Sequence, residues 1–260
     1  MLPSLFLSHG SPMLALEDIP ARAFLRELGP AMEAAYRRPS AILIASAHWE
    51  TEHAAVNAVA WNDTIHDFHG FPPALYQLRY PAPGSIELAD RVEGLLGAAG
   101  LAHARDSARG LDHGAWVPLL MAWPAADIPV VALSVQSHLD AAHHIRVGEA
   151  LAALREEGVL VIGSGAMTHD LRRFRGSDPN GPEQPDVAAF NGWMTQALTE
   201  GRRDDLIHYR ERAPYAVAQH PTEEHMLPLF VALGAGGQHA KHLHASVRYG
   251  FLRMDAWSFG

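Results

Sequence analysis

Short hydrophobic runs alternate with longer segments of helical periodicity along most of this chain. The runs are nearly continuous in apolar residues, which is typical of strands buried on both faces of a parallel sheet. We therefore expect buried strands at residues 2–8, 41–47, 129–135 and 158–164, and a closing strand at 246–254. Helices are expected at residues 21–36, 85–99, 139–157, 186–198 and 222–233, with Asp140 capping the third and Gly158 stopping it.

The alternation of strand and helix predicts one α/β domain over residues 1–260, with a central, mostly parallel sheet flanked by helices. Two stretches interrupt the pattern. Residues 62–85 are rich in proline, glycine and aromatic side chains, which favours an ordered pocket wall, and residues 175–185 resemble a mobile surface loop. Functional residues are then expected at the carboxyl ends of the strands.

Composition narrows the possible functions. A formal charge of −9 disfavours nucleic-acid binding, which needs clustered lysine and arginine. The chain has no cysteine, so any metal would be held by nitrogen and oxygen ligands. No apolar run is long enough for a membrane span, and the first residues lack the basic region of a signal peptide. We therefore expect a soluble, cytoplasmic protein that contacts neither membrane nor nucleic acid.

Histidines follow several of the predicted strands. His9 and His48 come directly after the first and second strands, and would meet if these strands are neighbours. His169 follows the fourth, after a Gly163-Ser164-Gly165 turn that would let backbone approach a bound group closely. One histidine at a strand end is more often structural than functional, but several in corresponding places indicate a metal site, because neutral imidazole binds zinc, iron or copper.

A fourth histidine, His225, falls in the first turn of the helix predicted at 222–233, with Thr222 as its cap. A helix N-terminus disfavours imidazolium and so favours the neutral form that binds metal. Glu224 competes with His225 as the third ligand, because two histidines and one carboxylate are a common iron-binding set.

Other histidines have weaker claims. His113 opens an apolar helix and is a candidate for substrate binding or catalysis, with a buried structural role about equally plausible. His66 and His69 lie in the aromatic stretch and are candidates to touch substrate, although exposed loop positions are the simpler interpretation. The remaining histidines are assigned to surface or structural roles, and His220 is the hardest of these to exclude because it is close in sequence to His225.

Six motifs carry a resemblance to a known family. They are LFLSHGSP, SAHWE, TIHDFHGFPPALYQLRYPAPGS, GLDHGAWVPL, GSGAMTHDLR and PTEEHMLPLFVALGA, and in this order they closely resemble the 4,5-DOPA extradiol dioxygenase family, within the class III extradiol ring-cleavage dioxygenases. The resemblance implies an α/β domain like that of the catalytic subunit of protocatechuate 4,5-dioxygenase. It also implies a divalent metal, Fe(II) for oxygen chemistry, with Zn(II) possible in the purified protein.

The resemblance also implies roles for single residues. It assigns metal ligation to His9, His48 and His225, and it assigns His169 both to acid–base catalysis and to the metal site. From their positions in the sequence alone, His113 is expected to bind substrate or assist catalysis, and His66 to bind substrate.

The expected reaction is insertion of O2 into a catechol, DOPA or a related compound, to give a ring-opened semialdehyde. The expected partners are the catechol and O2, in a monomer or small homo-oligomer. The alternatives are a zinc-dependent hydrolase that uses the same histidines, and a non-catalytic metal-binding protein with a closed site.

Overall fold

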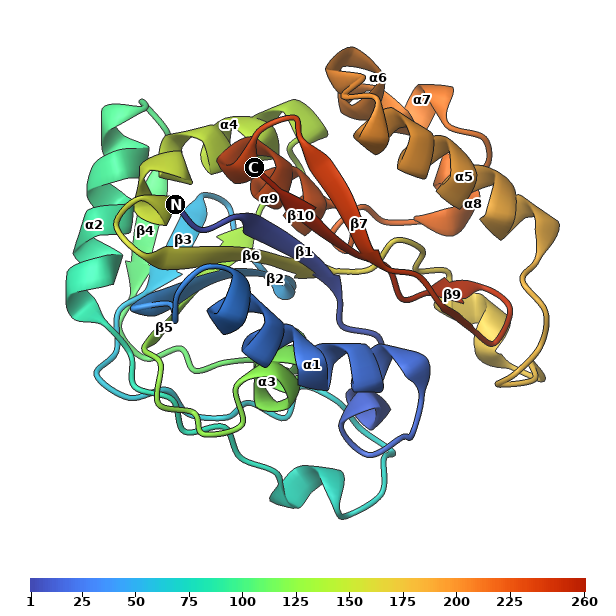
Figure 1. Cartoon of the computed structure of the whole chain (residues 1–260), viewed down its shortest axis with the longest axis horizontal. Coiled ribbons are helices and arrows are strands. Elements are labelled where there is room, and N and C mark those ends of the chain that lie inside the picture. The colour runs from blue at the N-terminus through green and yellow to red at the C-terminus, as the bar shows by residue number, and fades with distance from the viewer.

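A single mixed sheet forms the centre of the molecule in a computed structural model that describes residues 1–260 (Figure 1). Its strand order is β4-β3-β5-β2-β6-β1-β10-β7. The four predicted buried strands are confirmed, and they lie side by side and parallel at the centre of the sheet. They are β5 (Val130–Val135), β2 (Ala41–Glu50), β6 (Val159–Gly165) and β1 (Ser4–Ser8). Their carboxyl ends therefore share one edge of the sheet.

Antiparallel pairs border this parallel centre on both sides. Strand β3 pairs antiparallel with β5 and carries β4 beside it, while β10 pairs antiparallel with β1 and with β7. Three of these short strands, β3, β4 and β7, had no clear hydrophobic signal in the sequence. The bounds are β3 (Ala54–Asn57), β4 (His103–Asp106), β7 (Ala240–His244) and β10 (Ala256–Phe259).

The closing strand predicted at residues 246–254 is wrong. These residues form a separate small hairpin of β8 (Val247–Arg248) and β9 (Leu252–Arg253), and β10 follows them and joins the main sheet. The physical reason is a tight turn, since Tyr249 and Gly250 both adopt left-handed backbone conformations with φ of 57° and 69°. A continuous strand cannot pass through two such residues.

Helices cover both faces of the sheet (Figure 1). Helices α1 and α3 pack together on one face, and α2, α4 and α9 lie on the other. Asp140 caps α4 as predicted, but the helix ends at Leu151 and is followed by a 3-10 turn, so Gly158 does not stop it. Gly158 lies just before β6 with a φ of 88°. The bounds are α1 (Pro20–Ala35), α2 (Ile86–Ala98), α3 (His113–Ala122), α4 (Ala141–Leu151) with a 3-10 turn at Ala152–Arg155, and α9 (Leu227–Gly236).

The helix predicted at residues 222–233 begins later than expected. Residues 222–226 form turns, and α9 starts at Leu227 with Pro228 at its beginning, where the missing N–H of proline leaves no hydrogen bond unmade. His225 therefore precedes the helix and does not lie in its first turn. Thr222 does not cap α9, whose N-cap residue is Met226.

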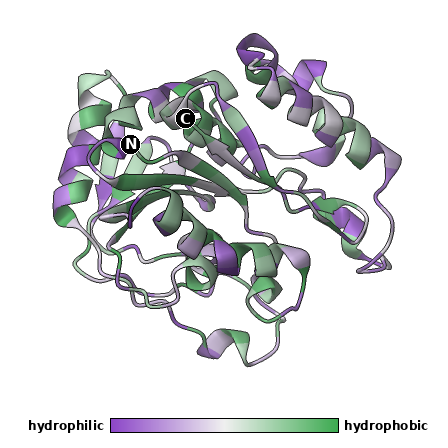
Figure 2. Cartoon of the chain, viewed as in Figure 1, coloured by the Kyte–Doolittle hydropathy of each residue, from purple (hydrophilic) through white to green (hydrophobic).

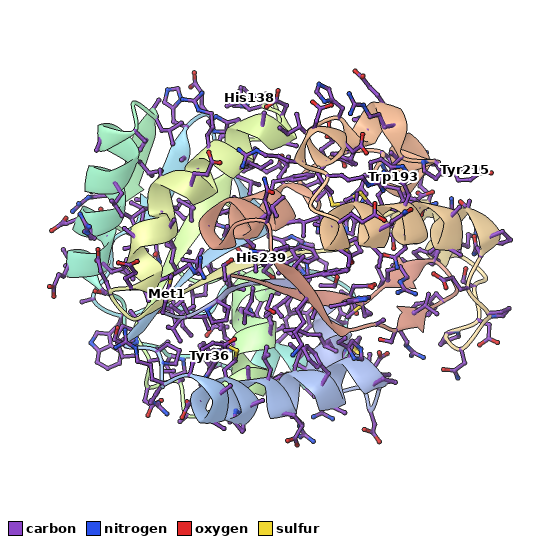
Figure 3. The ribbon with its side chains drawn as sticks, turned by 45° about the horizontal axis from the view of Figure 1, so that its top comes forward. Met1, Tyr36, His138, Trp193, Tyr215 and His239 are labelled. Carbon is purple, nitrogen blue, oxygen red and sulfur yellow. The ribbon has the colours of Figure 1, made fainter.

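A third group of helices lies beyond β7 (Figure 1). Helix α5 confirms the predicted helix at 186–198 and packs on the core through Phe190 and Met194. Figure 2 shows the central strands as hydrophobic, and Figure 3 shows Trp193 and Tyr215 on this peripheral layer, where Tyr215 is exposed. The bounds are α5 (Pro185–Thr199), α6 (Arg203–Ile207), α7 (Tyr209–Arg212) and α8 (Ala216–Gln219).

The two irregular stretches are largely without regular structure. The first contains only the 3-10 turn Leu75–Gln77, and the second is hydrogen-bonded to the β8–β9 hairpin, where Arg248 donates to the carbonyl of Pro179. Two further 3-10 turns, Pro12–Ala15 and Leu171–Phe174, lie near the carboxyl edge of the sheet. No helix of the structure combines the length and the apolar character needed to cross a bilayer.

Candidate metal centre

Three imidazoles converge at the carboxyl edge of the sheet. The Nε2 atom of His48 lies 3.0 Å from Nε2 of His9 and 3.2 Å from Nε2 of His225. His9 follows β1, whereas His48 lies inside β2, which runs on to Glu50 through an irregular stretch of the ladder. The two strands are not neighbours, because β6 lies between them. The side chains meet over the end of β6, where Ser164 and Gly165 are small.

The protonation of His9 is fixed by a chain of hydrogen bonds. The hydroxyl of Ser164 donates its proton to the carbonyl of Gly114, so its oxygen is free to accept from Nδ1 of His9, 3.0 Å away. With the proton on Nδ1, Nε2 of neutral His9 carries a lone pair. That lone pair points at the other two imidazoles.

Carboxylates lie behind the other two rings. Nδ1 of His225 donates to Oε1 of Glu224 at 2.9 Å, which leaves the lone pair of the neutral ring on Nε2. Nδ1 of His48 faces Oδ2 of Asp67 at 3.5 Å, a contact that is not a hydrogen bond. His225 lies close enough to His9 and His48 to share a metal ion with them, while Glu224 hydrogen-bonds to His225 and belongs to a second possible group with His169 and His225.

This arrangement fits a divalent cation. Three Nε2 lone pairs facing one another repel unless a positive charge lies between them. A metal–nitrogen distance of about 2.1 Å puts neighbouring ligand nitrogens roughly 3.0 to 3.4 Å apart, which is the spacing seen here. We conclude that His9, His48 and His225 form a group that can hold a divalent metal.

Burial keeps these imidazoles neutral. Desolvation, followed by the neighbouring histidines, lowers the pKa of His9 and of His225 well below the usual value. Desolvation and the adjacent His113 lower the pKa of His48 to about 3. Neutral imidazole is the form that binds metal, so the site is in its ligating state at neutral pH without having to release a proton.

Two further histidines flank these three converging imidazoles. The ring of His113 lies 3.9 Å from that of His48, and the ring of His169 lies 3.3 Å from that of His225, centroid to centroid. Desolvation and the nearby His220 lower the pKa of His169 to about 3, so His169 is also unprotonated. Its Nδ1 is 3.9 Å from Oε1 of Glu224, and it belongs to a different ligand group from that of His9 and His48.

A cavity of about 500 Å³ opens in front of this cluster. His48, His113 and His169 form its polar wall. The remaining wall is largely apolar and aromatic and includes no lysine, arginine, aspartate or glutamate; it contains Met13, Phe68, Phe71, Phe174, Tyr249 and Leu252. This volume and lining are typical of a site for a small, partly apolar organic molecule.

Not every predicted residue reaches the cavity. Nε2 of His66 lies 3.1 Å from the carbonyl of Leu78, and neither His66 nor His69 is among the residues that line the cavity. From the same stretch, Phe68 and Phe71 do line it, in agreement with the expected pocket wall.

The glycines of β6 serve a different purpose from the one predicted. Residues 163–165 continue strand β6 and do not form a turn. The backbone of a neighbouring segment of the protein packs closely against them, in place of a bound group. A Cβ atom on Gly165 would lie 2.1 Å from the carbonyl oxygen of His225, and one on Gly163 would lie 2.0 Å from that of Pro228. The glycines thus admit the segment that carries His225.

The sequence patterns did not reveal the roles of Asp67 and Ser164, each of which contacts a histidine of the cluster. Glu224, which was predicted only as a competing ligand, hydrogen-bonds to His225. The one available signal for Asp67 was its position inside the IHDFHGFP motif.

Comparison with known proteins agrees with this geometry. The family model for the catalytic LigB subunit of aromatic ring-opening dioxygenase matches residues 3–255. A 4,5-DOPA dioxygenase extradiol from Beta vulgaris is 47% identical over 98% of this chain and 95% of its own length. One from Escherichia coli (strain K12) is 41% identical over 90% of this chain and 85% of its own length.

A solved structure gives the same result for the fold. The crystal structure of an uncharacterized protein from Escherichia coli K12 superimposes with a TM-score of 0.81 at 34% identity, and all of both chains is covered. The family assignment does not favour the zinc hydrolase alternative. With three histidines placed to bind a metal beside an aromatic cavity, this chain belongs to the LigB family and is a ring-opening extradiol dioxygenase.

Proposed function

We propose that this protein holds Fe(II) through His9, His48 and His225 and inserts O2 into a catechol, DOPA or a related compound, to give a ring-opened semialdehyde. The observation that carries the proposal is the convergence of three Nε2 lone pairs at the inner end of an open aromatic cavity. A site closed by a fourth protein ligand would suit a structural metal, whereas this group of three faces the cavity through His48.

Bound Fe(II) would supply the oxygen chemistry, by binding catechol and O2 side by side and so removing the entropic cost of their encounter. The protein's contribution is to hold the ring in place. Phe68 and Phe71 present aromatic surface to the cavity, where a flat ring can pack against them. The apolar wall also excludes water from the reacting atoms.

His169 is the proposed acid and base. It is neutral before substrate binds and lines the cavity, so its Nε2 can take the proton of a catechol hydroxyl. The negative charge of the resulting catecholate favours the imidazolium and raises the low pKa of His169 toward neutrality. The same ring can then return the proton as the ring opens.

His113 is proposed to bind a substrate oxygen. Its ring lines the cavity and lies tilted against the ring of His48, whereas His169 stacks on His225. Two non-ligand histidines, each beside a different ligand, are suited to the two adjacent oxygens of a catechol.

The experiment is oxygen consumption by protein loaded anaerobically with Fe(II), recorded with the visible spectrum over a panel of catechols. We expect oxygen uptake together with a new chromophore from the semialdehyde. Resorcinol, whose hydroxyls are not adjacent, and the Zn(II)-loaded protein are controls and should show neither. Absence of uptake with every catechol would refute the proposal.

The same panel of catechols should show which ring substituent the cavity accepts. Because no cationic side chain lines the cavity, a carboxylate directly on the ring has no partner there. 4-Methylcatechol should therefore have a higher kcat/KM than protocatechuate.

We also propose that the protein works on small molecules in the cytoplasm, as a monomer or small homo-oligomer. The formal charge of −9 supports a role away from nucleic acid. A chain without cysteine has no need of an oxidising compartment.

A further inference from the structure

We propose that Asp67 is a positioning residue of this site, which fixes the proton of His113 on Nδ1 so that His113 offers an unprotonated Nε2 to the substrate. The inference rests on the proposed function, because it concerns how the cavity receives a catechol hydroxyl. Asp67 does not line the cavity itself and would act only through the histidines that it contacts.

The carboxylate of Asp67 makes two hydrogen bonds to one residue. Oδ1 accepts from the backbone N–H of His113 at 2.9 Å, and Oδ2 accepts from Nδ1 of the same residue, also at 2.9 Å. The main-chain N–H holds Oδ1 in place, so Oδ2 is the oxygen that faces the ring of His113. The ring is thereby oriented as well as bound.

The two hydrogen bonds place the shared proton on His113. Oδ1 of Asp67 already accepts from the main chain, and Oδ2 faces Nδ1 of the ring as an acceptor. In neutral His113 the single ring proton therefore lies on Nδ1, which leaves the lone pair on Nε2.

That lone pair has no partner within the protein. His113 is 6% exposed and lines the cavity, and Nε2 takes part in no protein hydrogen bond. Nε2 is not among the polar atoms that are fully buried without a partner, so a ligand or water in the cavity can supply the missing donor. A catechol hydroxyl is a donor of the required kind, so we infer that Nε2 of His113 accepts a hydrogen bond from the substrate.

Helix stability does not require this contact. Asp112 already caps α3 by accepting from the N–H of Ala115, and only one oxygen of Asp67 binds the backbone at the start of the helix. The second oxygen faces both His113 and, at 3.5 Å, Nδ1 of His48. Asp67 therefore connects a proposed metal ligand with a proposed substrate contact, a position in which carboxylates typically orient imidazoles.

The substitution Asp67→Asn separates positioning from structure. Asn keeps an oxygen for the N–H of His113, so α3 stays anchored, but its amide group then faces Nδ1 as a donor. Nδ1 must become an acceptor, and the proton moves to Nε2. The cavity would then present a donor where the substrate also offers a donor.

Three measurements test this: the 15N NMR tautomer state of His113 in the Zn(II)-loaded protein, kcat and KM of the Fe(II)-loaded protein, and the melting temperature. His113→Gln assigns the NMR signal. Asp67→Ala leaves both tautomers accessible, and Asp140→Asn, an exposed cap where Asn serves equally well, is the matched control.

For Asp67→Asn we expect a melting temperature close to that of the wild type, a shift of His113 to the Nε2–H tautomer and a roughly 10- to 100-fold loss of kcat/KM. Asp67→Ala should be no worse in kcat/KM. The proposal is overturned if Asp67→Asn keeps the Nδ1–H tautomer, or if its kcat/KM stays within twofold of the wild type. It is also overturned if Asp67→Ala alone loses activity in parallel with stability.

Failure of the proposed function would look different. Wild-type protein would then consume no oxygen with any catechol, and the NMR measurement by itself would still decide whether Asp67 sets the protonation of His113.

Discussion

The hydroxyl of Ser164 donates to the carbonyl of Gly114, although Gly114 lies inside helix α3. Within a helix this carbonyl would normally accept from the residue four positions later, but that residue is Pro118, which has no N–H. The proline therefore frees a carbonyl that directs the Ser164 proton away from His9. Ser164 in turn accepts from His9, so one missing hydrogen bond within α3 determines the protonation of a proposed metal ligand on another element.

Replacement of Ser164 by alanine should weaken metal binding. Without its acceptor, Nδ1 of His9 is no longer fixed as the protonated nitrogen, and we expect about a 10- to 100-fold loss of Zn(II) affinity in competition with a chelating dye. Ser4→Ala is a matched control, since Ser4 is also a buried serine that donates to a helix carbonyl, at the start of β1. Equal losses in both variants would contradict a specific role for Ser164.

Replacement of Gly165 by alanine should displace His225. The added Cβ would overlap the carbonyl oxygen of His225, which is backbone and cannot rotate away. We expect loss of metal affinity and a lower free energy of unfolding, by about 1–3 kcal/mol, the usual cost of overpacking. Gly94→Ala, where a Cβ meets no atom within 4 Å, serves as control. A Gly165→Ala variant with wild-type metal affinity would show that His225 is not held by this contact.

The ligand assignment predicts that His9→Ala and His48→Ala lose the metal. Each removes one of only three converging nitrogens, so the purified variants should contain well under one metal ion per chain by elemental analysis. By contrast, His113→Ala should keep its metal, because in the wild type Nδ1 of His113 binds Asp67 and His113 is not one of the three proposed ligands. Full metal occupancy in His9→Ala or His48→Ala would refute their assignment as ligands.

His169→Ala tests the proposed acid and base. If His169 moves protons without holding the metal, the variant should keep its metal and lose turnover by about 100-fold or more, the usual scale for general acid–base catalysis. The two readouts are metal content and steady-state oxygen consumption. Loss of the metal would instead make His169 a ligand, and retained activity would remove it from the mechanism.

Stability should fall in acid because of buried neutral histidines outside the site. His144 donates from Nδ1 to the carbonyl of Asp140 and accepts from the N–H of Gln136, and burial is the main cause that lowers its pKa to about 4. The unfolded chain binds this proton near pH 6.5, so the stabilising contribution is complete above pH 6.5 and is lost as the pH falls toward 4.

This contribution can be isolated with His144→Gln. Between pH 6.5 and 4.5 the stability difference between wild type and variant in urea unfolding should shrink by roughly 1.4 kcal/mol per pH unit. A difference that stays constant or widens in acid would show that His144 is not held in its neutral form.

Much of the architecture could be predicted from the sequence. The four central strands are buried on both faces, and the resulting apolar runs are a local property that can be recognised in the chain itself. Likewise, the histidines were found because each lies beside the end of such a run or ahead of an apolar helix. The predicted start of α9 and the predicted last strand were wrong. Pro228 sets the start of the helix, and the left-handed backbone of Tyr249 interrupts the strand. Hydrophobic periodicity contains no information on either backbone effect.

The sequence by itself determined the α/β fold and indicated the three histidines that converge at the carboxyl edge of the sheet, since both depend on residue type and local pattern. Only the tertiary structure decided which nitrogen of each imidazole is free. That choice depends on Asp67, Ser164 and Glu224, and two of these three are distant in the chain from the imidazoles they contact: Ser164 is 155 residues from His9, and Asp67 is 46 residues from His113. Contacts between such distant residues form only when the strands are placed side by side, so local sequence patterns carry no record of them.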